Sequence, residues 1–131
     1  MSTIWLFAGL VLGACFIALA RTFGERRIFA VGLIVAALIY LGFAVFGHAD
    51  PRWIGTEVLG VALYGTVAWL GLRHTAWWLV VGWAAHPIWD IALHLVGSST
   101  YAPSWYAILC ISFDVLVALY IASQCRRRAG A

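Results

Sequence analysis

The residues best suited to chemistry are three ionisable side chains, His86, Asp90 and His94, which follow one another at intervals of four in an otherwise apolar segment. In an α-helix this spacing places all three within an arc of about 80° on one face. The surrounding segment, residues 76–96, is long enough to cross a bilayer as a helix. Inserting an aspartate at the centre of such a helix costs about 2.5–3.5 kcal/mol, so this placement indicates a functional site.

Asp114 and Glu57 are further acids that fall inside apolar segments. At about 1.5 Å per residue, Asp114 lies about 13 Å and Glu57 about 6 Å from one end of their segments. Measured from the same side, Asp90 lies about 9 Å and His86 about 15 Å deep. Carboxyl groups at different depths differ in proton affinity, which separates acid from base roles. Asp90, Asp114, His86 and Glu57 are therefore the candidate acid/base residues.

Aromatic side chains share the helix faces of these acids. Tyr64 lies on the same stripe as Glu57, and Tyr106 precedes Asp114 by about two helical turns. Aromatic rings attract cations, so these side chains could stabilise a cationic intermediate of a lipophilic substrate. The predicted ligand-binding residues are Trp83, Trp89, Tyr106, Tyr64 and His94.

A metal or haem site is the alternative interpretation of the same residues. His86 and Asp90, or Asp90 and His94, are one helical turn apart and could share a divalent metal, with Asp114 completing the set. His86 and His94 lie about 12 Å apart along the helix axis, so one ion bound by both would be strained. The sequence contains no C-x2-C or H-E-x2-H motif. The metal-ligand set in this interpretation is His86, Asp90, His94 and Asp114.

The composition indicates a membrane protein. Of the 131 residues, 65% are hydrophobic and 10% are charged, and the mean hydropathy is +0.98. These values exclude a soluble globular domain and, despite the net charge of +3, argue against a nucleic-acid partner. The cysteine count of three is odd and does not indicate a disulfide framework. We expect one transmembrane domain, residues 1–131, with the lipid bilayer as its surroundings.

The apolar segments predict an all-α fold, a bundle of five membrane-spanning helices. Short turns make consecutive helices antiparallel neighbours. The predicted spans are residues 4–20, 28–46, 53–72, 76–96 and 105–122.

Arginine positions predict the orientation of the bundle. With the N-terminus outside, seven of the eight basic residues fall on the inner side, and Arg52 falls on the outer side. Short loops rich in arginine remain in the cytoplasm, so we expect the N-terminus outside and the C-terminus cytoplasmic. The buried acids then lie toward the outer surface. This arrangement predicts an outward-opening intramembrane pocket.

The sequence around these acids resembles an uncharacterised family, a domain of unknown function, of small multi-span bacterial integral membrane proteins. The resemblance covers roughly the C-terminal half of the chain and implies a multi-pass protein of the bacterial inner membrane without supplying an activity. The matching residues are His86, Trp89, Asp90, His94, Pro103, Trp105, Tyr106, Cys110 and Asp114.

Three classes of function remain open. The first is acid/base chemistry on a lipophilic small molecule, or binding of one, and the second is the metal or haem site. The third is a proton-coupled carrier or a subunit of a larger complex, because buried carboxylates also serve as proton relays. Five spans are few for a carrier unless it forms a homo-oligomer, and no inverted repeat is evident. The pattern favours a binding or catalytic pocket and leaves open whether the protein is an enzyme.

The predicted orientation can be tested with reporter proteins that are active only in the cytoplasm. Fusions after Arg128 or within residues 21–27 should be active, because these basic segments stay inside. Insertions in the loop at residues 97–104 should be inactive. Cytoplasmic activity from that loop would overturn both the orientation and the outer position of the acids.

Overall fold

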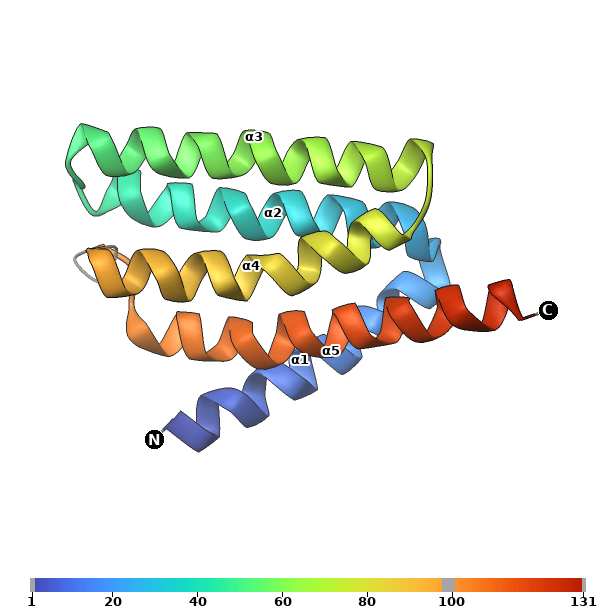
Figure 1. The fold of residues 1–131 in the computed structure, drawn as a ribbon. Helices are drawn as coiled ribbons and strands as arrows, with labels where there is room; N and C mark the ends of the chain where they lie inside the picture. Colours follow the sequence, from blue (N-terminus) through green and yellow to red (C-terminus); the bar gives the residue numbers. More distant parts are fainter. Residues whose placement is uncertain (1, 98–100, 131) are drawn as a thin grey trace.

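The computed structural model describes residues 2–97 and 101–130, and in this part of the chain it contains five α-helices (Figure 1). Each helix is long and apolar enough to cross a membrane. The prediction of an all-α bundle with five membrane-length helices is therefore confirmed. Of the predicted loop at residues 97–104, residues 98–100 lie outside the described part. The helices are α1 (Ser2–Phe23), α2 (Glu25–Phe46), α3 (Pro51–Arg73), α4 (Trp77–Val96) and α5 (Ser104–Ala129).

Helix α5 continues past the predicted end of its span at residue 122 and includes the arginines of its last turn. Cationic side chains are favourable there, because they lie at the negative end of the helix dipole. Because the helices alternate in direction, the arginines in the sequence gather at one end of the bundle, except Arg52 at the opposite end. We call these the arginine end and the loop end. The residues that define the arginine end are Arg21, Arg26, Arg27, Arg73, Arg126, Arg127 and Arg128.

The helices do not pack equally against one another. Helix α1 packs mainly on α5, α2 packs on α3, and α4 packs on α5. Helix α1 has fewer contacts with α2, and Figure 1 shows the two helices diverging from their shared turn toward the loop end. Helix α1 is therefore packed less closely on α2 than on α5.

The largest apolar core fills the half of the bundle nearer the arginine end. Its members come from all five helices and are fully buried or nearly so. Among its described members there is no carboxyl, imidazole or guanidinium group, so it separates the arginine end from the polar interior described below. Its largest fully buried members are Trp83, Phe29, Leu33, Leu79 and Val117.

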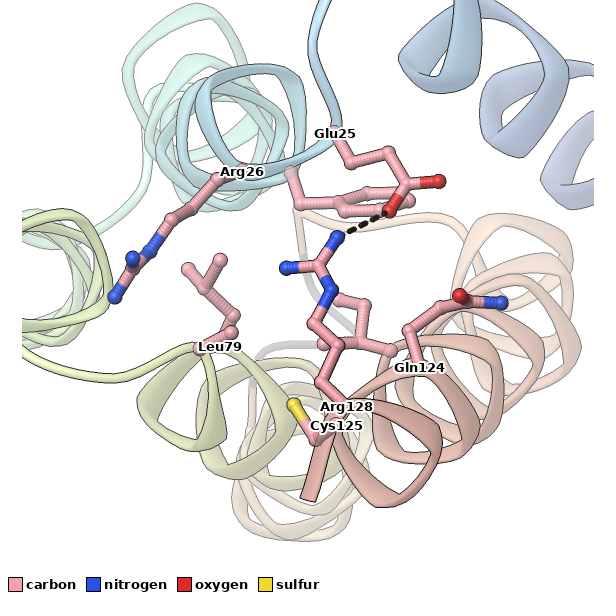
Figure 2. A pocket seen from close by; sticks show the side chains of 9 residues that line it. Glu25, Arg26, Leu79, Gln124, Cys125 and Arg128 are labelled. Carbon is pink, nitrogen blue, oxygen red and sulfur yellow. Dashed lines mark ion pairs between the residues drawn. The ribbon is translucent and has the colours of Figure 1, made fainter. Parts of the chain in front are cut away.

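Polar contacts join the helices at the arginine end (Figure 2). The Glu25 carboxylate accepts a hydrogen bond of 2.6 Å from the Tyr120 hydroxyl and pairs with Arg128 at 3.7 Å. Arg26 donates to the backbone carbonyl oxygens of Gly71 and His74, where α3 ends. The cavity among these residues is about 20 Å³, so it has room for about one water molecule.

Asp50 fixes the beginning of α3. Its carboxylate accepts a hydrogen bond of 3.0 Å from the backbone N–H of Arg52, and Pro51 occupies the first helical position. This hydrogen bond, together with the nearby Arg52 guanidinium, holds the pKa of Asp50 below its usual range. The cap sets the rotational phase of α3 and so helps to direct Glu57 into the bundle.

Glycine allows α1 to approach α5 closely. A Cβ atom added at Gly9 would collide with the Leu109 carbonyl oxygen, and one added at Gly13 would lie 3.1 Å from Leu116 Cδ2. Small residues at such spacing let helix backbones pack tightly in membranes. Close packing of α1 therefore depends on these glycines.

Replacing Gly9 tests this contact. Gly9→Ala should lower the free energy of unfolding in detergent by about 1–3 kcal/mol, because the backbone of α5 must move to accept the methyl group. Gly65→Ala is the matched control, because a Cβ at Gly65 meets nothing within 4 Å. That variant should gain up to about 1 kcal/mol from its higher helix propensity. Equal effects of the two changes would contradict close packing of α1 on α5.

Candidate functional site

His86, Asp90 and Asp114 meet inside the bundle, and each side chain is only 1% exposed. The His86 Nδ1 atom lies 2.8 Å from Asp114 Oδ2 and 3.4 Å from Asp90 Oδ2. One imidazole nitrogen therefore faces two carboxylates. Because His86 and Asp90 belong to α4 and Asp114 belongs to α5, the cluster ties these two helices together.

Helical periodicity explains how the cluster forms. His86 and Asp90 are one turn apart on the buried stripe of α4, and Asp114 follows Cys110 by one turn on the buried stripe of α5. Pro87 lies within α4 and removes a backbone hydrogen bond beside His86. Figure 1 shows α4 changing direction near its middle. The two buried stripes face each other across the α4–α5 contact.

The charges in this cluster must be balanced locally, because water does not solvate side chains that are this deeply buried. Two carboxylates that share a dry site cannot both stay ionised without a cation or a bound proton. The imidazole is the only basic group within hydrogen-bonding distance of them in the described residues. The arrangement can therefore hold a proton and pass it between His86 and either aspartate.

Asp90 is the member of the cluster with unused hydrogen-bonding capacity. Within the described residues, neither of its carboxylate oxygens has a hydrogen-bond partner, although Oδ2 pairs electrostatically with His86. The buried Tyr40 hydroxyl is close enough to Asp90 to interact with it as a polar partner, but the two do not meet the geometry of a hydrogen bond in this structure. Buried polar groups are rarely left unsatisfied. Asp90 and Tyr40 are thus the pair best placed to receive a ligand group.

Glu57 on α3 extends the polar interior toward the loop end. It is 2% exposed and accepts a hydrogen bond of 2.7 Å from the Tyr101 hydroxyl. Burial and this hydrogen bond raise the pKa of Tyr101, so its hydroxyl remains a donor. Glu57 also interacts electrostatically with His86 and Asp90. In the structure, all four candidate acid/base residues are therefore close enough to interact electrostatically.

Aromatic rings surround the His86 imidazole. The Tyr64 ring centroid lies 5.1 Å from it and the Tyr40 centroid 6.0 Å, both in edge-on geometry. Trp89 contacts Tyr64, with ring centroids 6.2 Å apart. Tyr106 packs on Tyr40 at 5.5 Å. These rings make an apolar enclosure in which electrostatic interactions are strong.

Trp83 lies farther toward the arginine end, within the apolar core. Its indole N–H donates a hydrogen bond of 3.1 Å to the backbone carbonyl of Phe29, and its ring stacks near Phe16 and Phe113. Trp83 therefore borders the cluster from the side of the core.

The structure places His94 apart from the other predicted residues. It is partly exposed near the loop end, where its Nε2 atom lies 3.2 Å from the Ser104 hydroxyl. In the described part of the chain, the group that could hold a metal ion consists of His86, Asp90 and Asp114. His94 is not a member, because eight residues separate it from His86 by about 12 Å along the helix axis.

Tyr40 and Tyr101 were not identified from the sequence. The sequence position of Tyr40 does indicate a buried polar group, because it is the only hydroxyl-bearing side chain in residues 28–46. It lies about 9 Å from the end of that segment. Tyr101 looked like an ordinary loop residue. Its contact with Glu57 joins positions 44 residues apart and depends on the tertiary structure.

Removing the His86 imidazole should destabilise the protein, because the two buried carboxylates then repel each other without a neighbouring cation. His86→Ala leaves two buried carboxylates without a nearby cation and should lower the free energy of unfolding by about 3–5 kcal/mol. Adding Asp114→Asn should restore part of this loss, because one buried charge is removed. His94→Ala, at a partly exposed position, should change stability by less than about 0.5 kcal/mol. Additive losses in the double variant would contradict the coupling of His86 and Asp114.

The family to which the chain belongs has no assigned activity. Residues 4–127 match the model of a family of unknown function (DUF6010), so the match extends well beyond the C-terminal half. No curated protein and no solved structure matches the chain. The function must therefore be argued from the site itself. The chain belongs to the family of unknown function DUF6010.

Proposed function

We propose that this protein is a small integral membrane protein that performs acid/base chemistry on a lipophilic small molecule in an intramembrane His/Asp pocket. The supporting observation is the position of His86 Nδ1, 2.8 Å from Asp114 and 3.4 Å from Asp90, among side chains that are almost fully buried. Buried ionisable groups in membrane proteins are costly and usually mark a functional site. Here three buried ionisable side chains lie close enough to one another to exchange a proton.

In this proposal, each member of the cluster has a different role. The short contact with Asp114 orients the His86 imidazole and stabilises its protonated form. Asp90 has oxygens that no described residue hydrogen-bonds, so it is the group that would meet a substrate. Tyr40, next to Asp90, would donate a hydrogen bond to the same molecule. The pair His86–Asp90 would thus act as acid and base, with Asp114 as the orienting group.

In this proposal, protons reach the cluster from the loop end, which faces outward in a bacterial inner membrane. Glu57 lies between the cluster and that end and is covered by Tyr101. Movement of Tyr101 away from Glu57 would open the pocket outward. The apolar core lies in the opposite direction, and its described members include no carboxyl or imidazole group that would relay a proton.

Deuterium transfer can test the proposal before the substrate is identified. The purified protein is reconstituted with a bacterial lipid extract in D2O, and the lipids are analysed by mass spectrometry. After the lipids are returned to H2O, we expect at least one of them to retain carbon-bound deuterium or to have changed in mass with the wild-type protein, because acid/base chemistry at carbon incorporates solvent deuterium that simple O–H exchange does not retain. Asp90→Asn should abolish the change. His94→Ala is the control and should retain it.

The acid/base proposal fails if no lipid changes, or if Asp90→Asn leaves the change intact. Asp114→Asn should reduce the rate by about 100-fold or more, because general acid/base groups contribute about 10²–10⁴-fold. The variant Asp90→Asn/Asp114→Asn should lose little more than Asp90→Asn alone, because the groups act as a unit.

A divalent metal site is the second candidate, and one observation favours it. His86, Asp90 and Asp114 each offer a ligand atom, and these atoms lie within 4.8 Å of one another. Imidazole nitrogen and carboxylate oxygen bind zinc at about 2.0–2.2 Å, so the three groups fit around one ion after small side-chain shifts. The metal would occupy the position from which His86 and Asp90 would otherwise exchange a proton.

Elemental analysis distinguishes the two candidates. Protein purified without chelator should contain about one equivalent of zinc, iron or copper if the cluster is a metal site, because three protein ligands bind such ions tightly. Asp90→Asn and Asp114→Asn should then lose the metal, and His94→Ala should retain it. Substoichiometric metal in the wild-type protein, or retention by both aspartate variants, would contradict this alternative.

A further inference from the structure

A lateral cleft leads from the side of the bundle to the buried cluster. It has a volume of about 300 Å³ and lies where α1 and α2 diverge in Figure 1. Its walls come from α1, α2 and α5 with Trp83 of α4, and Asp114, which is almost fully buried, is one of the lining residues. We define the lateral cleft by Phe16, Gly32, Ala36, Ile39, Leu109 and Asp114.

We propose that the lateral cleft admits a single-chain lipophile with an uncharged, hydrogen-bond-donating head group, such as a long-chain alcohol, from the bilayer to Asp114. This inference rests on the proposed function and specifies its substrate class and route of entry. The apolar chain lies between α1 and α2, and the head group first meets Asp114, which lines the cleft and contacts the His86–Asp90 pair through His86.

The shape and lining of the cleft fit an apolar chain. A volume of about 300 Å³ is at the lower end of the range for small-molecule sites, about 300–1,000 Å³. Gly32 and Ala36 provide little side-chain volume on α2, whereas Phe16 and Leu109 supply apolar walls from α1 and α5. In a membrane the open side of this cleft faces hydrocarbon. A lipophile can therefore enter without crossing water.

The carboxylate at the cleft, without a neighbouring arginine or lysine, favours an uncharged head group over an anionic one. Among the described residues that line it there is no arginine, and the sequence contains no lysine. An anionic head group such as a phosphate would approach the carboxylates of Asp114 and Asp90 without a neighbouring arginine or lysine to pair with it. A carboxylate accepts hydrogen bonds, so a hydroxyl group can donate to it. The inner end of the cleft therefore favours an alcohol over a phosphate ester.

The loop end offers a less direct route for such a molecule. Tyr101 is bonded to Glu57, and Tyr40, Ala102 and Cys110 form a second apolar cluster at that end. A long chain entering there would have to separate these side chains. The lateral cleft, by contrast, connects the hydrocarbon region with Asp114 in the structure as it stands.

Photolabelling tests the route and the head group together. The full chain is reconstituted in phosphatidylcholine vesicles with dodecanol that carries a diazirine at its chain end, or with the matching dodecyl phosphate. After illumination, labelled peptides are mapped by mass spectrometry. We expect the alcohol to label the walls near Phe16, Ile39 and Leu109, with excess unlabelled dodecanol competing. The phosphate should label these positions at least tenfold less.

Variants of the cleft provide the controls. Ala36→Phe fills the cleft from α2 and should abolish labelling of its walls, and Ile39→Trp is a second blocking variant at a bilayer-exposed position. Ala62→Phe adds the same ring at an exposed position of α3 and should leave labelling unchanged. Circular dichroism confirms that each variant keeps its helices. Asp114→Asn should reduce the preference for the alcohol over the phosphate.

The possible results distinguish failure of the lateral route from failure of the acid/base proposal. The inference is overturned if the walls are not labelled, if both blocking variants label normally, or if the phosphate labels as well as the alcohol. If labelling fails but lipids still gain deuterium in an Asp90-dependent manner, the lateral route is wrong and the acid/base proposal stands. If labelling succeeds but no deuterium is gained, the lateral cleft binds a lipophile and the acid/base proposal is wrong.

Discussion

The contact between His86 and Asp114 is the interaction on which the site depends. It joins α4 to α5 through charged or polar groups that are removed from water, where an unpaired carboxylate would cost several kcal/mol. Asp90 adds a second carboxylate to the same imidazole nitrogen. Replacing such a cluster with apolar side chains is often neutral or stabilising in proteins. A contribution of the cluster to folding stability therefore does not explain its presence, whereas a role in the proposed function would.

The bundle is divided into two halves with different properties. Toward the arginine end, the core is apolar and the helix ends are joined by Glu25, Arg26 and Arg128. Toward the loop end, buried carboxyl and hydroxyl groups replace much of that core. An apolar half hinders proton movement, because its described core offers few polar side-chain groups, chiefly the Tyr64 hydroxyl and the Trp83 indole N–H. In the proposed function, the polar half would therefore exchange protons with the loop end rather than with the arginine end.

Helix α1 packs closely on one neighbouring helix and loosely on another. Gly9 lets α1 approach α5 closely, whereas its contact with α2 is limited and leaves the lateral cleft between them. Packing in a membrane relies on close contact of small residues, because lipid is as apolar as the helix surface. Where that contact is missing, lipid chains compete with side chains for the same space. The same geometry that closes α1 against α5 thus leaves access to Asp114 from the side.

The number of helices, their approximate limits and their apolar character follow from the sequence by itself. Runs of apolar residues of membrane length and the arginines that end them are local properties, so they could be recognised without the tertiary structure. The spacing of His86 and Asp90 likewise fixed their common face, since helical geometry is regular. The resemblance to a family of unknown function was also correct.

The composition of the cluster was decided by the tertiary structure. Asp114 meets His86 across 28 residues, and Tyr101 meets Glu57 across 44, because of how α4, α5 and the loop pack. His94 shares a helix face with His86, yet it lies about 12 Å farther along the axis, where it contacts Ser104 instead of the cluster. Periodicity gives the face of each helix, but only packing determines which faces meet. The pairing of α1 with α5, and the cleft that results, depended on contacts between segments about 100 residues apart in the chain.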